Sequence, residues 1–385
     1  MKEISVKTVE DKEYKVYIES GILDKLGKHL SDITENRRVI IITNPLVNSL
    51  YGVKLLSTLK KNEFKGDLIE VPDGEKYKCL SSAKYLYDEL LKRKAGRTTT
   101  LIALGGGVIG DLTGFVAATY MRGLPLVHVP TTLLAQIDSS IGGKVAVDHP
   151  LAKNIIGSFY QPKAVYTDPE ILQTLSDQDV KNGIVEAIKI AVIKSPPFFK
   201  WFKKNINQII KKDRDLLFEL VKEAVSLKVD IVLKDPWESG LRKALNFGHS
   251  IGHAMEVGIG YQDLNHGEAV ALGMLIETKI ARNRGMCSED LEEQIKNILS
   301  FLPSSLSSSP SPLSFPRKRE SILKYIKNTN YNQFCETLTL DKKNYKGKIT
   351  FILPDTLGKV TLVDNITKKE VIKAFEEFKK EWELC

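Results

Sequence analysis

The sequence predicts two domains, an N-terminal α/β domain on a mostly parallel sheet and an all-helical C-terminal domain. The chain has 385 residues, more than one ordinary hydrophobic core accommodates. Strand and helix patterns alternate through roughly the first 170 residues, and from about residue 175 every periodic segment has a helical period. We therefore expect one domain at 1–174 and a second at 175–385.

Composition restricts the class of protein. Apolar residues make up 42% and charged residues 27% of the chain, which is typical of a globular enzyme. The net charge of +8 comes from dispersed residues without a basic stripe, so we expect no nucleic-acid partner and an anionic small substrate. The four cysteines form no C-x-x-C pair, which favours a reducing compartment. With no signal-peptide core or membrane-length apolar run, we expect a cytoplasmic protein that makes no membrane contact.

The elements of the first domain follow in order. Residues 3–9 and 13–20 flank a short charged turn and predict a hairpin. A helix is predicted over 81–94. Because strands that alternate with helices form parallel sheets with both faces covered, the remaining apolar runs should be buried strands. These runs are 37–43, 66–71, 99–104, 125–130 and 163–168.

The second domain is predicted from helical periodicity. The periodic segments are 176–193, 214–235, 243–257, 267–285 and 288–302. Residues 303–321 break this pattern because they are rich in Ser and Pro and have no period. We interpret them as a flexible surface insertion. The alternative is a regulatory or binding segment, since this stretch contains the charged residues "RKRE".

Glycines give the clearest chemical signal in the first domain. Gly105, Gly107 and Gly110 match G-x-G-x-x-G between a predicted strand and a predicted helix. Such a turn lets the backbone approach a pyrophosphate and present N–H groups at a helix N-terminus. The alternative is a turn needed only for packing. The acidic residue that usually follows about twenty positions later is replaced by Thr131, so the ribose must be held differently.

Two polar segments accompany the glycines. Asp73 and Gly74 suggest a turn before a helix start in 71–78, which is either part of a site or a surface turn. Residues 130–159 look like a long polar loop, which favours a site over a surface excursion. Hydroxyls and lysines that could bind phosphate oxygens lie in this loop.

Histidines and a buried-looking carboxylate mark the second domain. His249 and His253 are one helical turn apart, and His266 precedes the next predicted helix. Glu186 and Lys189 lie in an otherwise apolar helix, where they are costly unless paired or functional. Two or three histidines with one carboxylate form a zinc-type ligand set. The spacing leaves open whether His249 and His253 are both ligands, one ligand and one acid/base, or core histidines.

At these residues the sequence resembles the 3-dehydroquinate synthase family of sugar-phosphate cyclases. The matching stretches occur in family order and are 73–78, 105–123, 128–159, 186–189, 245–257 and 265–274. The resemblance implies an N-terminal NAD-binding α/β domain and a C-terminal helical metal- and substrate-binding domain.

The implied activity converts 3-deoxy-D-arabino-heptulosonate 7-phosphate to 3-dehydroquinate and phosphate, in the shikimate route to aromatic amino acids. It proceeds by transient oxidation with NAD, phosphate elimination, re-reduction and aldol closure. Three alternatives stay open: another NAD- and metal-dependent sugar-phosphate cyclase, a metal-dependent polyol dehydrogenase, and a catalytically inactive binding protein.

The resemblance also implies cofactor residues. Glu186, His249 and His266 would bind one divalent metal, zinc or cobalt. NAD would be contacted by Asp73, Gly74, Glu75, Lys76, Tyr77, Lys78, Gly107, Val108, Ile109, Gly110, Asp111, Thr131, Thr132, Lys144, Lys153, Ile171, Leu172, Gln173 and Thr174.

The substrate, a phosphorylated sugar acid, would face a further set of residues. These are Arg122, Asp138, Lys144, Asn154, Lys189, Lys228, Arg242, Asn246 and His253, the last as a hydrogen-bonding or proton-transfer group. The family also has a substrate-binding lysine after its last core helices; here the 303–321 stretch precedes Lys342 and Lys343, so the sequence does not decide which one reaches the substrate. We expect a homodimer.

Overall fold

The computed structural model describes residues 1–7, 13–34, 36–259, 264–301, 325, 326, 328–340 and 350–383. The expected insertion at 303–321 and the candidate lysines Lys342 and Lys343 lie outside these residues. The chain forms two compact units. The first comprises Met1–Val180 and Lys212–Trp237, and the second comprises Lys181–Lys211 and Glu238–Cys385. The units interleave along the chain. The helix at 214–235, expected in the second domain, therefore packs in the first unit. The expected boundary at 174/175 between the NAD-binding domain and the metal- and substrate-binding domain stays a prediction.

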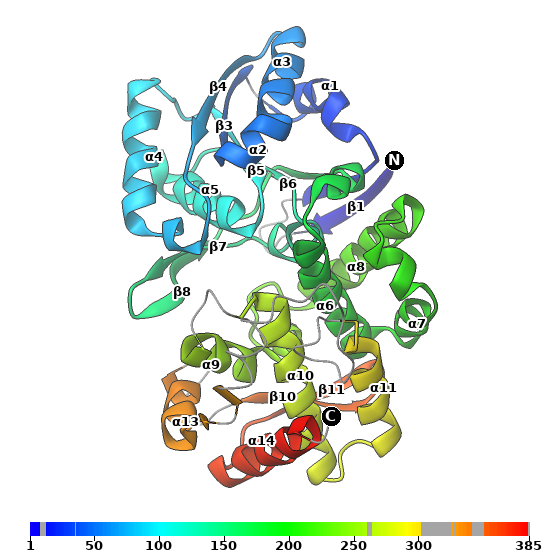
Figure 1. The fold of residues 1–385 in the computed structure, drawn as a ribbon. Coiled ribbons are helices and arrows are strands. Elements are labelled where there is room, and N and C mark those ends of the chain that lie inside the picture. Colours follow the sequence, from blue (N-terminus) through cyan, green and yellow to red (C-terminus); the bar gives the residue numbers. More distant parts are fainter. Residues whose placement is uncertain are drawn as a thin grey trace. The chain divides into compact units, whose positions relative to one another are not determined.

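The first unit contains a seven-stranded sheet (Figure 1). Its strand order is β1-β2-β9-β6-β5-β3-β4, with only β1 antiparallel to its neighbour. The predicted strands are therefore confirmed as one mostly parallel sheet. Their bounds are β1 Lys2–Lys7, β2 Glu13–Ile18, β3 Arg38–Thr43, β4 Lys65–Glu70, β5 Thr100–Gly105, β6 Leu126–Pro130 and β9 Ala164–Thr167.

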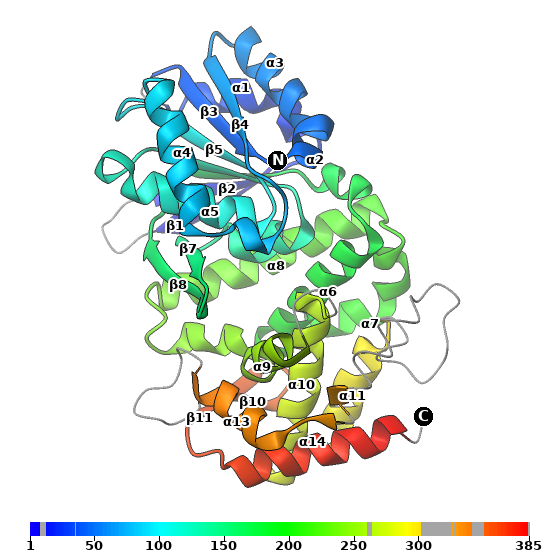
Figure 2. The same cartoon turned by 60° about the vertical axis from the view of Figure 1, so that its left-hand side comes forward.

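Both faces of this sheet are covered. Successive residues of a strand point to opposite faces. Accordingly Val39 and Ile41 of β3 belong to one buried cluster, and Ile40 and Ile42 belong to another. The first cluster includes residues of α1 and α3, and the second includes residues of α4 and α5 (Figure 2). The helices of this unit are α1 Leu26–Ser31, α2 Pro45–Val47, α3 Val53–Lys61, α4 Leu80–Lys92, α5 Gly107–Thr119 and α8 Arg214–Lys234.

The segment 130–159 is more ordered than predicted. The expectation of a long loop was wrong, because the segment forms a helical turn at Ala135–Ser139 and a hairpin of β7 Lys144–His149 and β8 Ala152–Phe159. Val145 and Val147 alternate with more exposed residues and are buried. Val145 lies against α5 where a Cβ at Gly114 would come within 2.3 Å of its Cγ1. The polar composition concealed this short period of two.

The second unit is built around α10. This helix contacts α9, α11, α14 and β10, and most of its side chains are buried. The predicted fold class is confirmed, with elements added that the sequence analysis did not expect: helices α7, α13 and α14 and the β10–β11 hairpin. The bounds are α6 Asp177–Lys194, which enters this unit at Lys181, α7 Pro196–Ile210, α9 His249–Ile259, α10 His266–Asn283, α11 Glu289–Leu299, α13 Tyr331–Leu340, β10 Phe351–Thr356, β11 Lys359–Val363 and α14 Lys368–Glu383.

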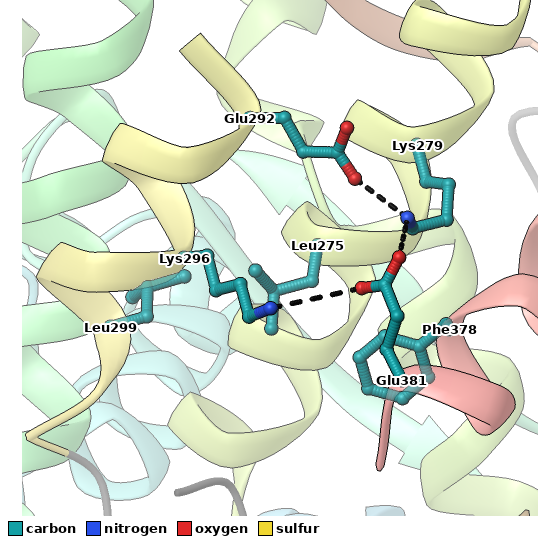
Figure 3. A pocket seen from close by; sticks show the side chains of 7 residues that line it. All are labelled: Leu275, Lys279, Glu292, Lys296, Leu299, Phe378 and Glu381. Atoms are coloured by element: carbon teal, nitrogen blue, oxygen red, sulfur yellow. Dashed lines mark hydrogen bonds and ion pairs between the residues drawn. The ribbon is translucent and has the colours of Figure 1, made fainter. Parts of the chain in front are cut away.

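Ion pairs join three of these helices around a small pocket (Figure 3). The Lys279 ammonium of α10 lies 2.7 Å from Glu292 of α11 and also pairs with Glu381 of α14. Glu381 in turn faces Lys296 at 3.9 Å. The charged side chains that line the pocket therefore pair with one another, so the network links the helices. Among the described residues, no helix has the length and apolarity needed to cross a membrane.

Candidate functional site

Three side chains from three helices converge in the second unit. Glu186 lies on α6, His249 is the first residue of α9 and His266 is the first residue of α10. The Nε2 atoms of His249 and His266 lie 3.7 and 3.6 Å from the same oxygen, Oε1 of Glu186. One ligand atom from each residue falls within 4.8 Å of the other two. Two imidazoles and one carboxylate form the donor set of a zinc-type site that keeps an open position.

Close packing of α9 on α10 fixes the place of His249. Gly248 has φ +79°, and a Cβ there would lie 2.6 Å from the carbonyl oxygen of Val270. A Cβ at Gly273 would lie only 1.8 Å from the Gly248 carbonyl oxygen. The N–H of Gly248 donates to Oε2 of the fully buried Glu277 at 2.7 Å. Because backbone meets backbone here, the start of α9 has little freedom to move along α10.

His249, which follows this contact, points its Nε2 atom toward Glu186. Nδ1 of His249 lies 3.3 Å from the Phe247 carbonyl oxygen. If Nδ1–H donates to that oxygen, the Nε2 lone pair is left for a metal. Glu186 is fully buried and pairs with the Lys189 ammonium, itself 2% exposed. A buried carboxylate is stabilised by such a partner and by a bound cation.

His266 is flanked by two carboxylates. Its Nε2 faces Glu186, and its Nδ1 lies 3.2 Å from Oε1 of Glu256. Burial lowers the pKa of His266, but the hydrogen bonds to Glu186 and Glu256 outweigh it and raise the pKa to about 9. The metal-free ring is therefore protonated at neutral pH, and a cation would have to displace that proton.

His253 lies beside this group without joining it. Its ring centroid is 5.4 Å from that of His249 and 6.2 Å from that of His266. Its ligand atoms group with Glu256 and His266 instead of with Glu186 and His249. This geometry disfavours His249 and His253 as ligands of one metal and leaves His253 available as a neighbouring hydrogen-bonding residue.

In the first unit, the glycine turn lies at the carboxyl ends of neighbouring strands. Gly106 is the residue before α5, directly after β5, and Thr131 and Thr132 directly follow β6. A Cβ at Gly106 would lie 3.0 Å from Thr132 Cγ2, and one at Gly107 would lie 3.2 Å from Ser139 Oγ. The structure thus brings the predicted Gly107–Asp111 and Thr131–Thr132 segments together. Carboxyl ends of parallel strands are where nucleotides bind in such sheets.

Lys78 connects several other predicted residues to this turn. Its side chain is 6% exposed and lies 2.5 Å from Asp111 Oδ2. Burial lowers the pKa of Lys78, but Asp111 and Glu75 outweigh that effect and raise it overall, so the ammonium stays charged. Lys78 also donates to Oδ1 of Asn154, which has φ +52°. At the same edge, Asp73 Oδ1 accepts a hydrogen bond of 2.9 Å from Asn44 after β3.

Known proteins resemble this chain over most of its length. Family models described as 3-dehydroquinate synthase N-terminal and C-terminal match residues 68–182 and 183–344. The chain belongs to the 3-dehydroquinate synthase family. A 3-dehydroquinate synthase of Thermodesulfovibrio yellowstonii is 40% identical over 367 residues, covering 95% of this chain and 98% of the relative. One of Desulforamulus reducens is 39% identical over 369 residues, covering 95% and 98%. The resemblance drawn from the motifs is confirmed.

Solved structures show the same fold. A 2-deoxy-scyllo-inosose synthase complexed with carbaglucose-6-phosphate, NAD+ and Co2+ is 23% identical, with a TM-score of 0.83 over 98% of this chain and all of that one. The 2-epi-5-epi-valiolone synthase of Streptomyces hygroscopicus, with NAD+ and Zn2+ bound, is 25% identical, with a TM-score of 0.79 over 98% and 99%. An iron-containing alcohol dehydrogenase is more distant, at 14% identity and a TM-score of 0.60 over 95% and 97%.

Other residues that the resemblance to 3-dehydroquinate synthases assigned are placed as follows. In the first unit, Lys228 Nζ lies 2.5 Å from both the carbonyl oxygen and Oδ1 of Asp138. Lys144 and Arg122 are exposed, and Lys153 is half-buried. Arg122 follows Met121 in a run with positive φ, 51° and 64°, a strained backbone of a kind that clusters at functional sites.

The turn at Pro169–Thr174 is tied within the first unit. Ile171 and Leu172 are buried, and the Ile171 carbonyl oxygen accepts a hydrogen bond of 3.1 Å from the Tyr51 hydroxyl. The Gln173 amide donates to the Lys212 carbonyl oxygen at 2.8 Å. These contacts hold the turn in place within the first unit.

Three glutamates in the second unit were missed by the sequence analysis. Glu256 and Glu277 are both buried. Glu256 contacts His266, and Glu277 contacts Gly248 in the turn before His249. Glu238 has φ +58° and accepts a 2.8 Å hydrogen bond from the Asn246 amide. Arg242 is buried in the same turn. For Glu256 a signal existed, because it lies one turn after His253 on the predicted helix.

Proposed function

We propose that this chain catalyses the 3-dehydroquinate synthase reaction, in which 3-deoxy-D-arabino-heptulosonate 7-phosphate is converted to 3-dehydroquinate and phosphate. The observation that carries the proposal is identity of about 40% to synthases over 95% of the chain. Identity to the solved 2-deoxy-scyllo-inosose synthase and 2-epi-5-epi-valiolone synthase is lower, at 23% and 25%. The proposed reaction belongs to the shikimate route to aromatic amino acids.

The proposed cofactors are one divalent metal, zinc or cobalt, and NAD. Support for the metal comes from the converging nitrogen and oxygen donors of Glu186, His249 and His266, which suit these ions. Support for NAD comes from the glycine turn at the start of α5, whose free N–H groups would bind the anionic pyrophosphate. When bound, the metal would supply Lewis-acid polarisation of a substrate oxygen, and NAD would supply a reversible hydride acceptor.

The roles of the chain's own residues follow from their charge and surroundings. Lys189 would hold the Glu186 carboxylate and orient one of its oxygens toward the two histidines. Lys228 would orient the Asp138 carboxylate through their ion pair. His253 would accept or donate a proton at an imidazole nitrogen beside the proposed ligands.

Cationic and polar groups would bind the anionic substrate. A phosphate and a carboxylate on one small molecule require several positive partners, and guanidinium and ammonium groups supply them. The proposed substrate-binding residues are Arg122, Lys144, Asn154, Lys189, Lys228, Arg242 and Asn246.

A phosphate-release assay tests this function. The full chain, loaded with zinc or cobalt and NAD, should release phosphate from the heptulosonate phosphate and lose activity with a chelator. It should accumulate no NADH at 340 nm, whereas a polyol dehydrogenase would accumulate about one NADH per turnover. Faster turnover of sedoheptulose 7-phosphate or glucose 6-phosphate would instead assign another cyclase activity. Release of phosphate from none of the three would overturn the proposal.

We also propose a cytoplasmic homodimer. The location is supported by the thiols, because Cys79, Cys287 and Cys335 are all free, as expected in a reducing compartment. Light scattering of the purified chain measures the assembly, and a mass corresponding to one chain of 43.2 kDa would contradict the dimer.

A further inference from the structure

Glu256 lies immediately outside the proposed ligand set. It is on α9, two turns after His249, and only 3% of its surface is exposed. Its Oε1 lies 3.2 Å from Nδ1 of His266 on the neighbouring helix. The other nitrogen of the same ring, Nε2, lies 3.6 Å from Glu186. One imidazole is therefore held between a carboxylate of the ligand set and a carboxylate outside it.

The two ring nitrogens of a neutral imidazole have different roles in hydrogen bonding and metal binding. One carries a proton and donates, and the other has the lone pair that binds a metal. A carboxylate accepts a hydrogen bond and cannot donate one when ionised. Next to Glu256, the proton is favoured on Nδ1, and the lone pair is then on Nε2, facing Glu186. The opposite tautomer would place a lone pair against the Glu256 carboxylate and repel it.

We propose that Glu256 is a positioning residue for the metal centre: it accepts the Nδ1–H hydrogen bond of His266 and thereby fixes the tautomer and ring orientation of that ligand. This inference rests on the proposed role of His266 as a ligand. Hydrogen bonds of this kind on the far side of a metal-binding histidine typically raise metal affinity 10- to 100-fold. Glu256 thus acts on the metal through His266, without binding it.

The geometry also allows a competing interpretation. His253, Glu256 and His266 offer three ligand atoms within 4.8 Å of one another. A second ion there would need Nδ1 of His266 as a ligand and would break the hydrogen bond to Glu256. The existing 3.2 Å contact favours the hydrogen bond. The two interpretations differ in the number of ions bound.

The test compares three variants of the full-length, metal-free chain. Glu256→Leu removes the acceptor, and Glu256→Gln keeps a weaker carbonyl acceptor. The control, Glu292→Gln, changes a partly buried glutamate of the same unit, whose partners are Lys279 and Arg282. Zinc and cobalt dissociation constants are measured by competition with a chelator at one fixed pH. The metal stoichiometry, the visible spectrum of the cobalt form and the melting temperature are measured for each variant as well.

We expect Glu256→Leu to weaken metal binding 10- to 100-fold and Glu256→Gln to recover part of that loss. Stoichiometry should stay at one ion, and the cobalt spectrum should shift because the ring is no longer fixed. Glu292→Gln should lower the melting temperature and leave metal affinity within about twofold, since additivity holds for separate sites. If Glu256→Leu does not fold, the intermediate affinity of Glu256→Gln still carries the test.

Two results would overturn the inference. The first is wild-type affinity in both Glu256 variants. The second is binding of two ions by the wild type with one lost in each variant, which would make Glu256 a ligand of a second site. Failure of the ligand assignment is separate, because it would show as normal metal affinity in His266→Ala, whatever the Glu256 variants do.

Discussion

Gly273→Ala is predicted to disrupt metal binding although it changes no ligand and introduces a better helix former. An added Cβ would lie 1.8 Å from the carbonyl oxygen of Gly248 and 3.0 Å from its Cα. Ordinary van der Waals contact begins near 3.4 Å, so the two backbones must separate by about 1.6 Å. His249 directly follows Gly248 and moves with it. Metal sites tolerate ligand displacements of only about 0.2 Å, so affinity should fall at least about tenfold.

The expected stability change has two opposing contributions. Ala is favoured over Gly in a helix interior by about 1 kcal/mol. Overpacking against a backbone that cannot rotate away costs about 3 kcal/mol or more. The collision therefore outweighs the propensity gain, and the metal-free variant should be less stable by about 2 kcal/mol.

Chelator competition and denaturant unfolding measure the two quantities. Gly96→Ala is the control, because a Cβ at Gly96 meets nothing within 4 Å. It should keep wild-type metal affinity and stability. A Gly273→Ala protein with unchanged affinity and equal or greater stability would refute the argument that backbone contact between α9 and α10 sets the place of His249.

Three further predictions concern the same centre. His266→Ala should lose metal and nearly all activity, because a three-ligand site cannot spare one; normal metal content by elemental analysis would contradict this. His253→Ala should keep metal and lose much of kcat, and loss of both together would make His253 a ligand. The pKa of His266 near 9 in the metal-free protein, against an ordinary 6.5, means that metal must displace a proton below pH 9. The apparent metal dissociation constant should therefore rise about tenfold per unit as pH falls from 8 to 7, whereas an ordinary histidine would leave it nearly flat there.

Much of the first unit could be predicted from the sequence because its strands are buried on both faces. The run 39–42 is continuously apolar and buried, and only a covered parallel strand accommodates it. The β7–β8 hairpin was missed because most of β8 is exposed and its apolar residues do not alternate with polar ones. Helix α7 had a start signal that was overlooked: Ser195 caps it by accepting from the Phe198 N–H, before two prolines.

The metal residues were less predictable from spacing than from resemblance. Helical spacing correctly places His249 and His253 near each other, but it offers them as co-ligands. The structure pairs His249 with His266 on another helix, around Glu186 on a third. Glu256 could have been noticed one turn after His253, but Glu277 lies on a helix where a glutamate ordinarily faces water, so only its three-dimensional surroundings reveal it.

The convergence of three helices on one point depends on how closely their backbones approach. A Cβ at Gly267, the residue after His266, would lie 2.6 Å from the Asn182 Cα on α6. That contact brings the start of α10 against the helix that carries Glu186. The contact between Gly248 and Gly273 does the same for the start of α9. Because each approach is closed by backbone atoms, a larger residue at Gly267 cannot be absorbed by a side-chain rotation. Metal affinity should therefore respond to substitutions at these glycines as strongly as to substitutions in residues that contact the ligands.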